Sequence, residues 1–126
     1  DLGDRHYDGE TAIICVCNGR YYGGGFMPVG EAMPDDGVLD FLVVPKVSRF
    51  TFFRLVGKYA KGEYRDFPQV ICHWHGDRIT FSSTEEIIAV VDGETVRGSG
   101  FTIGLSEKKL NFFWPAGLDY QVRTGT

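Results

Sequence analysis

The stretch "GVLDFLVVPK", residues 37 to 46, decides the fold that this sequence can adopt. It is rich in Val, Leu and Phe, a "MPDDG" turn signal leads into it, and Pro45 bounds it behind. A short apolar run between turn residues, enriched in β-branched and aromatic side chains, is typical of a buried strand. We therefore predict that this segment is a strand inside a β-sheet core.

Strand signals continue on both sides of this segment. "TAIICVC", residues 11 to 17, is β-branched and apolar and leads into an Asn-Gly pair. The predicted strands follow one another at a spacing near the roughly 8–12 residues typical of β-sandwiches. This spacing predicts a mostly β fold built as a two-sheet antiparallel β-sandwich. The further predicted strands are "PQVICHWH", "RITFSS", "EIIAVVD", "TVRG", "FTIGLS" and "KLNFFWP".

One segment, "SRFTFFRLVGKYAKG", has helical periodicity, and we expect a helix over about residues 48–61. Ser48 can cap its start and Gly62 can end it. Two roles stay open: the helix packs its aromatic residues into the core, which we favour, or it lies on an anionic membrane as a basic amphipathic helix. The broad apolar arc holds Phe50, Phe52, Phe53, Leu55, Val56, Tyr59 and Ala60, and the remaining strip holds Thr51, Arg54, Lys58 and Lys61.

The overall composition is that of one globular domain. A length of 126 residues allows one hydrophobic core, and 43% hydrophobic with 24% charged residues is ordinary. The net charge is -4, whereas nucleic-acid-binding proteins carry an excess of basic residues, so no nucleic-acid partner is expected. No run approaches the roughly 18 apolar residues of a spanning helix, and the first residues lack a signal-peptide layout.

The cysteines indicate a reducing compartment. Cys15, Cys17 and Cys72 cannot all pair within one chain, and the first two lie too close along one strand to be natural bridge partners. We therefore expect reduced thiols and a cytoplasmic location. The chain opens at Asp1 with the polar segment "DLGDRHYDGE", which predicts a linker over residues 1–10 from a preceding domain and a β-sandwich domain over 11–126.

The longer stretch "NGRYYGGGFMPVGEAMPDDGVLDFLVV", residues 18 to 44, resembles the C-terminal domain of the diacylglycerol kinase catalytic family, which includes bacterial lipid kinases and the sphingosine and ceramide kinases. The order continues with a helix closed by "KG", a strand, "VDGE" at residues 91 to 94 and an apolar strand closing on Pro115. Matching elements span roughly residues 11 to 115. The matching residues of the first stretch are Asn18, Gly23, Gly24, Gly25, Pro28, Ala32, Asp36, Gly37, Leu39 and Asp40.

The resemblance implies an enzyme of two domains. The family's N-terminal domain carries a "GGDGT" nucleotide-binding loop, which is absent here, and "GGGF" is no substitute. The implied protein is an ATP- and Mg²⁺-dependent lipid kinase that phosphorylates a hydroxyl of diacylglycerol or a related lipid, with its active site in the cleft between the domains. This chain would supply the lipid-substrate wall, partner the N-terminal kinase domain and be inactive alone.

The resemblance also implies site residues. Phosphoryl transfer needs a group that takes the proton from the attacking hydroxyl, and Glu94 of "DGE" would be that base, with Asp92 and Gly93 shaping the turn. The alternative is a solvated residue after a favoured Asp-Gly turn. A structural magnesium ion would be held by the Asp36 carboxylate and the carbonyls of Met33 and Val38; the alternative is an Asx turn without an ion.

Five other residues with polar or metal-binding side chains need an explanation. Asp40 lies among apolar neighbours on its strand and needs a partner, and we favour structural hydrogen bonding. His73 and His75 share a strand face, as do Cys15 and Cys17, so the four could converge on zinc. Their spacing matches no finger or ribbon pattern, and we interpret the cysteines as buried small hydrophobes.

Two rival functions remain open. A noncatalytic binding module could use Trp74, Trp114, Tyr21 and Tyr22 as a carbohydrate platform, although core packing explains these scattered aromatics as easily. The second rival is the β-rich C-terminal half of a NAD kinase. The "DG.LD" and "VDGE" arrangement fits that enzyme less well.

Overall fold

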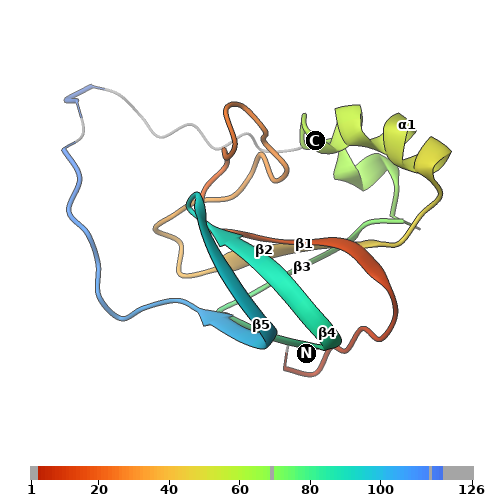
Figure 1. Cartoon of the computed structure of the whole chain (residues 1–126). Helices are drawn as coiled ribbons and strands as arrows, with labels where there is room; N and C mark the ends of the chain where they lie inside the picture. Colours follow the sequence, from red (N-terminus) through yellow and green to blue (C-terminus); the bar gives the residue numbers. More distant parts are fainter. Residues whose placement is uncertain (1–2, 69, 114, 118–126) are drawn as a thin grey trace.

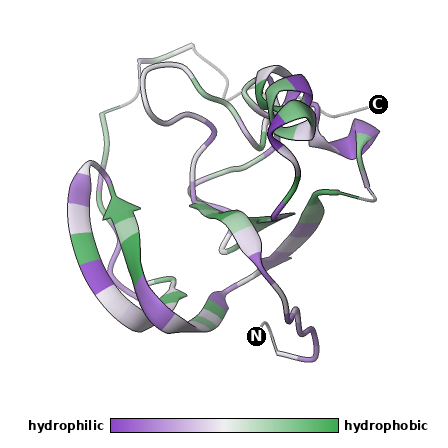
Figure 2. Ribbon diagram, turned by 45° about the vertical axis from the view of Figure 1, so that its right-hand side comes forward, coloured by the Kyte–Doolittle hydropathy of each residue, from purple (hydrophilic) through white to green (hydrophobic). Residues whose placement is uncertain are grey.

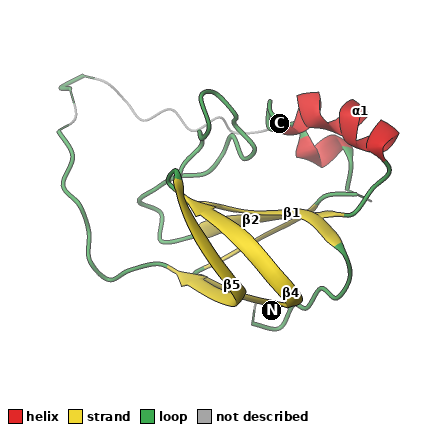
Figure 3. Ribbon diagram, viewed as in Figure 1, coloured by secondary structure: helices red, strands yellow, loops and turns green. Residues whose placement is uncertain are grey.

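The computed structural model describes residues 3–68, 70–113 and 115–117. Strands dominate this part of the chain, and one α-helix and one short 3-10 helix lie between the second and third strands (Figure 3). The elements are β1 (Thr11–Cys17), β2 (Leu39–Pro45), α1 (Arg49–Tyr59), η1 (Tyr64–Asp66), β3 (Cys72–Gly76), β4 (Arg78–Val91) and β5 (Glu94–Gly104). The predicted linker and domain, 1–10 and 11–126, extend beyond the described residues at both ends.

The strands form two antiparallel sheets. One has the order β1-β2-β3, and the other is the β4-β5 hairpin, which crosses beside the first sheet (Figure 1). The β4-β5 ribbon carries alternating bands of polar and apolar residues, as expected for a strand pair with one buried face (Figure 2). The predicted mostly β, two-sheet architecture with one helix is confirmed.

The central strand β2 is buried on both faces. Every residue from Leu39 to Val44 is buried, because the hairpin covers one face of the sheet, and α1 and the β1-β2 loop cover the other. A strand covered on both sides is apolar along its length instead of alternating, which is the pattern of the quoted stretch. The inner core consists of Leu39, Phe41, Ile79, Ile14, Val16, Trp74, Phe81, Ile103 and Leu105.

The outer face of the same sheet packs against a different set of residues. Leu42 and Val44 of β2 contact a cluster that includes Tyr59 of α1 and Val29 of the β1-β2 loop. Because side chains alternate along a strand, these positions and Asp40 point away from the hairpin. The outer face is therefore where the helix, the loop and a buried carboxylate meet.

Local signals set both ends of α1. The Ser48 side chain accepts a hydrogen bond from the Thr51 N–H at 3.2 Å, which confirms the predicted cap. Gly62 has φ +74°, and a Cβ there would lie 2.8 Å from the Met27 carbonyl oxygen, so only glycine fits. The Met27 N–H also donates to the Ala60 carbonyl at 2.9 Å, which joins the end of the helix to the β1-β2 loop.

The prediction that α1 buries its aromatic residues is wrong for two of them. Leu55 and Tyr59 are buried, whereas Phe50 and Phe53 are 75% and 74% exposed. Residues four apart lie on one helix face, so the narrow contact with the sheet holds Leu55 and Tyr59 and leaves the other part of the apolar arc in solvent. No helix in the described part of the chain is long and apolar enough to cross a membrane.

Strand boundaries differ from the prediction in the second half of the chain. "RITFSS" and "EIIAVV" form one continuous strand, β4, and a register shift between Ser82 and Ile87 accounts for the apparent break. "TVRG" and the following segment likewise join in β5. The predicted strand "KLNFFWP" is wrong for residues 109–113, which pair with no strand of the described chain and leave Phe112 and Phe113 exposed; Trp114 lies outside the described residues.

Candidate functional site

The tip of the β4-β5 hairpin carries the predicted base. Asp92 has φ +48° and Gly93 has φ +93°, and two positive φ values in a two-residue loop are the signature of a type I′ turn. This turn follows the twist of the strands, and Asp-Gly is a sequence that tolerates it. Glu94 begins β5 directly opposite Val91 and is exposed. The predicted turn role of Asp92 and Gly93 is confirmed, and catalysis by Glu94 and Asp92 stays a prediction.

The predicted magnesium ligands lie in the loop before β2. The Asp36 Oδ1 atom accepts a hydrogen bond from the Val38 N–H at 3.0 Å and Gly37 has φ +77°, which together define an Asx turn. Asp36 is exposed, while Met33 and Val38 are half-buried. One oxygen of the Asp36 carboxylate remains available, and carboxylate and carbonyl oxygens are the donors that Mg²⁺ prefers. The residues therefore fit the ion, and its binding stays a prediction.

The two acidic turns belong to separate elements. Figure 1 draws the β4-β5 tip over the loop that leads into β2. Asp36 accepts a hydrogen bond from the Val38 N–H of its own turn, and Glu94 is paired with Val91 of its own hairpin. The structure thus gathers Met33, Asp36 and Val38 in one loop and places Glu94 in another.

An apolar cavity, which the sequence did not predict, lies between α1 and the outer face of β1 and β2. Its volume is about 320 Å³. Four of its lining residues are themselves 37–44% exposed, so the cavity opens to the surface. The hydroxyls of Tyr22 and Tyr59 bond to each other at 3.0 Å, which leaves a hydrocarbon-like lining. The lining residues are Ala12, Ile13, Tyr22, Phe26, Val44, Val47, Phe52, Leu55, Val56, Tyr59 and Ile71.

Two cysteines lie beside this cavity on the outer face. The sulfur atoms of Cys15 and Cys17 are 3.3 Å apart, and Cys17 is buried while Cys15 is half-buried. The hydrogen bond from Cys17 lowers the pKa of the Cys15 thiol to about 7; burial opposes this shift and Tyr59 adds to it. The same hydrogen bond and burial raise the pKa of Cys17. Cys15 is therefore the acidic thiol of the pair.

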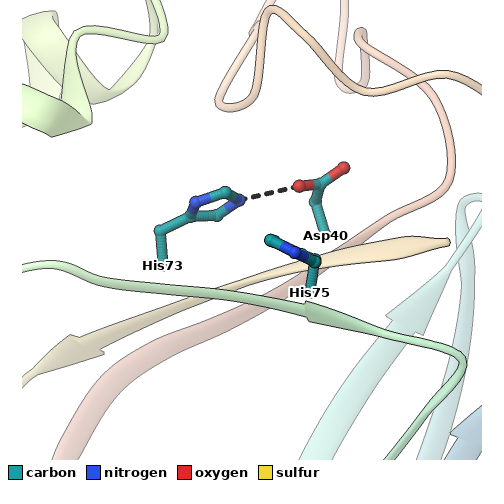
Figure 4. Close-up of side chains that lie close together, drawn as sticks. All are labelled: Asp40, His73 and His75. Carbon is teal, nitrogen blue, oxygen red and sulfur yellow. Dashed lines mark hydrogen bonds and ion pairs between the residues drawn. The ribbon is translucent and has the colours of Figure 1, made fainter.

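Asp40 has the partner that its burial requires. Its Oδ1 atom lies 2.7 Å from His73 Nε2, which confirms the expected structural hydrogen bond. His75 lies next to this pair, and the ligand atoms of Asp40, His73 and His75 are all within 4.8 Å of one another (Figure 4). In the described residues the histidines thus gather with Asp40, while Cys15 and Cys17 contact each other.

A chain of polar contacts continues from His73. The Tyr64 hydroxyl lies 3.3 Å from His73 Nδ1 and donates a hydrogen bond to Glu31, whose carboxylate also accepts from Arg65 at 2.7 Å. Burial alone would raise the pKa of Glu31, but the bonds from Tyr64 and Arg65 lower it overall. Burial and then the Glu31 contact raise the pKa of Tyr64. Glu31 is therefore held as a carboxylate and Tyr64 as a neutral donor.

The residues of the suggested carbohydrate platform do not share one surface. Trp74 packs in the inner core between the sheets, whereas Tyr21 is 69% exposed in the β1-β2 loop. Tyr22 stacks on Phe26 at the cavity, with ring centroids 5.6 Å apart. Trp114 lies outside the described residues. Of the described aromatic residues, Trp74 is therefore part of the core and Tyr22 lines the cavity.

Comparison with known proteins identifies the domain. A family model described as the YegS C-terminal NAD kinase beta sandwich-like domain matches residues 2–112. The chain belongs to this family. The family match confirms the resemblance to the C-terminal domain of bacterial lipid kinases, and its description likens the fold to the β-sandwich of NAD kinase.

Individual relatives of the family agree with this assignment. Proteins named "putative lipid kinase" from Staphylococcus aureus strains JH9, Newman and USA300 are each 27% identical to the chain over 93 residues. The match covers 74% of this chain and 30% of each relative. The chain thus corresponds to about 30% of the length of the curated relatives it matches.

Proposed function

We propose that this domain forms the lipid-binding wall of an ATP- and Mg²⁺-dependent lipid kinase. The observation that carries the proposal is the open apolar cavity on the outer face of the sheet, in a chain of the YegS C-terminal family. Relatives named as lipid kinases agree with a lipid ligand. The substrate would be diacylglycerol or a related lipid with a free hydroxyl.

The cavity suits an acyl chain better than a polar ligand. Its lining is aliphatic and aromatic, and its two phenol groups satisfy each other. Each methylene that moves from water into such a lining contributes about 0.8 kcal/mol. Several methylenes of one chain would therefore hold a lipid firmly while its polar end stays at the opening.

The exposed part of α1 supports contact with a membrane, where such a lipid resides. Phe50 and Phe53 project into solvent, and the basic residues Arg49 and Arg54 of the helix and Lys61 just after it are also exposed. Exposed aromatics beside basic side chains are typical of helices that lie at an anionic interface. We propose that α1 touches the membrane surface and brings the cavity opening to the lipid.

The reaction itself needs the nucleotide-binding domain that the family resemblance implies. Glu94 would accept the proton of the lipid hydroxyl while the oxygen attacks the γ-phosphorus, and ADP would leave. A Mg²⁺ ion that accompanies the nucleotide, separate from the structural ion expected at Asp36, would offset negative charge on the phosphates. The rigid type I′ turn at Asp92 and Gly93 would hold Glu94 at a fixed place on the hairpin tip.

The test uses this domain together with its nucleotide-binding domain, labelled ATP and a panel of lipids. Loss of a general base costs about 10²–10⁴-fold in rate, so Glu94→Gln should lower kcat by that factor on every accepted lipid. Glu85→Gln on β4, another exposed carboxylate of the same hairpin, is the matched control and should keep the rate. Wild-type turnover by Glu94→Gln would remove Glu94 as the base, and absence of phosphorylation of any lipid would contradict the kinase proposal.

A further inference from the structure

Three metal-binding side chains converge on the outer face of β2 and β3. Asp40 of β2 pairs directly with His75 of β3, and His73 lies two residues earlier on the same face of β3. All three side chains point from the strands to the same side, and their ligand atoms lie within 4.8 Å of one another (Figure 4). The cluster shares no residue with the Asp36 turn or with the apolar cavity.

The contacts around His73 are compatible with a proton on Nδ1. Tyr64 donates its one hydroxyl proton to Glu31. The Tyr64 oxygen, 3.3 Å from His73 Nδ1, accepts from that nitrogen in the tautomer protonated there. The 2.7 Å contact of His73 Nε2 with Asp40 Oδ1 is a hydrogen bond, and a metal ion bound to both atoms would replace it.

We propose that Asp40, His73 and His75 bind a divalent transition-metal ion, with Zn²⁺ the best match. Imidazole nitrogens and a carboxylate oxygen bind zinc at about 2.0–2.2 Å, which places tetrahedral ligand atoms roughly 3.3 Å apart. Small side-chain rotations reach this spacing, and His75 is exposed and can turn. Mg²⁺ prefers oxygen ligands, so the two imidazoles select against it.

The surroundings of His73 resemble the support that metal-binding histidines have in proteins. Such histidines donate their second N–H to a carboxylate, carbonyl or water, which fixes the ring and the tautomer. In the tautomer protonated on Nδ1, His73 donates to Tyr64, whose hydroxyl in turn donates to Glu31. This chain of contacts orients the Nε2 lone pair of His73 toward Asp40 and His75.

Burial of Asp40 adds an electrostatic reason for a cation. Asp40 is 7% exposed, and a cation would stabilise a carboxylate in such surroundings further than its hydrogen bond to His73 does. Arg65 pairs with Glu31, and Lys58 pairs with Asp66 and Glu63, so neither of these cations neutralises Asp40. Three protein ligands leave a fourth zinc position open, which water or an added ligand would fill beside the exposed His75.

The first experiment measures metal binding by the 126-residue chain after treatment with a chelator. Titration with Zn²⁺ in competition with a chromophoric chelator should show saturable binding of one ion per chain. Excess Mg²⁺ should not displace it. Co²⁺ should bind at the same site and give visible absorption bands of low coordination number. Absence of saturable Zn²⁺ binding would overturn the proposal.

Variants then locate the ion. His75→Ala removes an exposed ligand, so the fold should persist by circular dichroism while zinc affinity falls by more than about 100-fold. Tyr64→Phe removes only the hydroxyl that orients His73, and loss of such an outer group costs about 10–100-fold in affinity. Cooperative urea unfolding of each variant, with the wild-type midpoint for His75→Ala, separates loss of the site from loss of the fold.

Three controls exclude other positions for the ion. His6→Ala tests the third histidine, Asp36→Asn tests the oxygen-rich turn, and a Cys15→Ser, Cys17→Ser double variant tests the thiols. All three should bind zinc as the wild type does. Retained binding by His75→Ala, or loss of binding in the cysteine variant, would place the ion elsewhere and overturn the proposal. Neither result bears on lipid phosphorylation, so the two proposals fail separately.

Discussion

The two faces of the β1-β2-β3 sheet differ in what they contact, although they share the same strands. The inner face is apolar and meets the hairpin through residues such as Phe41, which is fully buried. The outer face holds an open cavity, a thiol pair and the buried Asp40 with its histidine. Alternate residues of one strand therefore have different surroundings: the inner set packs in the core of the domain, and the outer set meets a cavity and polar side chains.

The largest expected effect tests the inner face. Phe41→Ala removes a fully buried ring from the core between the sheets and should lower the free energy of unfolding by about 3–5 kcal/mol. Ile13→Ala, on the cavity side and 40% exposed, should cost less than about 2 kcal/mol because its surroundings are already open. Urea unfolding measures both, and equal costs would show that the two faces are packed alike.

The exposed part of α1 should matter for membranes and not for stability. A Phe50→Ser, Phe53→Ser double variant should bind anionic vesicles about 100-fold more weakly, because each ring buried at an interface contributes at least roughly 1.5 kcal/mol. Its free energy of unfolding should stay within about 0.5 kcal/mol of the wild type. Tyr21→Ser, an exposed aromatic outside the helix, is the control; vesicle sedimentation that shows no difference would contradict membrane contact by α1.

A smaller effect tests the cavity. Val56→Phe places a ring into the open space and should weaken binding of a fluorescent fatty acid by about 10-fold, with little change in stability because the cavity accepts the added volume. Val90→Phe makes the same change at an exposed position of β4 and should leave binding unchanged. Equal binding by the two variants in a fluorescence titration would mean that the acyl chain binds elsewhere.

The smallest effect concerns the thiol pair. Because the pKa of Cys15 is lowered to about 7, its thiolate fraction and its alkylation rate should rise as pH increases through 7. Cys17→Ala removes the S–H group that lowers this pKa, so the midpoint should move to higher pH. The measurement is the pH profile of iodoacetamide labelling in a Cys72→Ser background; an unchanged midpoint would show that Cys17 does not control Cys15.

Features fixed by local chemistry could be predicted from the sequence. The strand β1, the buried strand β2, the Ser48 cap and the Asp92-Gly93 turn each depend on neighbouring residues and a known backbone preference. The family resemblance likewise came from ordered local motifs.

Features fixed by distant contacts could not be predicted. The pairing of Asp40 with His73 depends on the β2-β3 register, which no short motif specifies. The exposure of Phe50 and Phe53 depends on how much of α1 the sheet covers, and a broad apolar arc alone does not show this. The cavity also depends on distant contacts, since it is the space that the helix and the outer face of the sheet leave between them. The apolar composition of "KLNFFWP" predicted a strand, but its described residues pair with no other strand of the described chain.

The close approach of Gly62 to the Met27 carbonyl constrains how the domain can adapt to ligands of different size. That contact, with the Met27 to Ala60 hydrogen bond, anchors one end of the helix to the loop beside it. The Ser48 end joins β2 through Lys46 and Val47, and the Lys46 N–H donates to the Glu10 carbonyl at 2.9 Å, so this end is held as well. We therefore expect α1 to keep its place when a ligand enters, so that the cavity would adapt through exposed lining side chains such as Phe52 and would reject ligands too bulky for that adjustment.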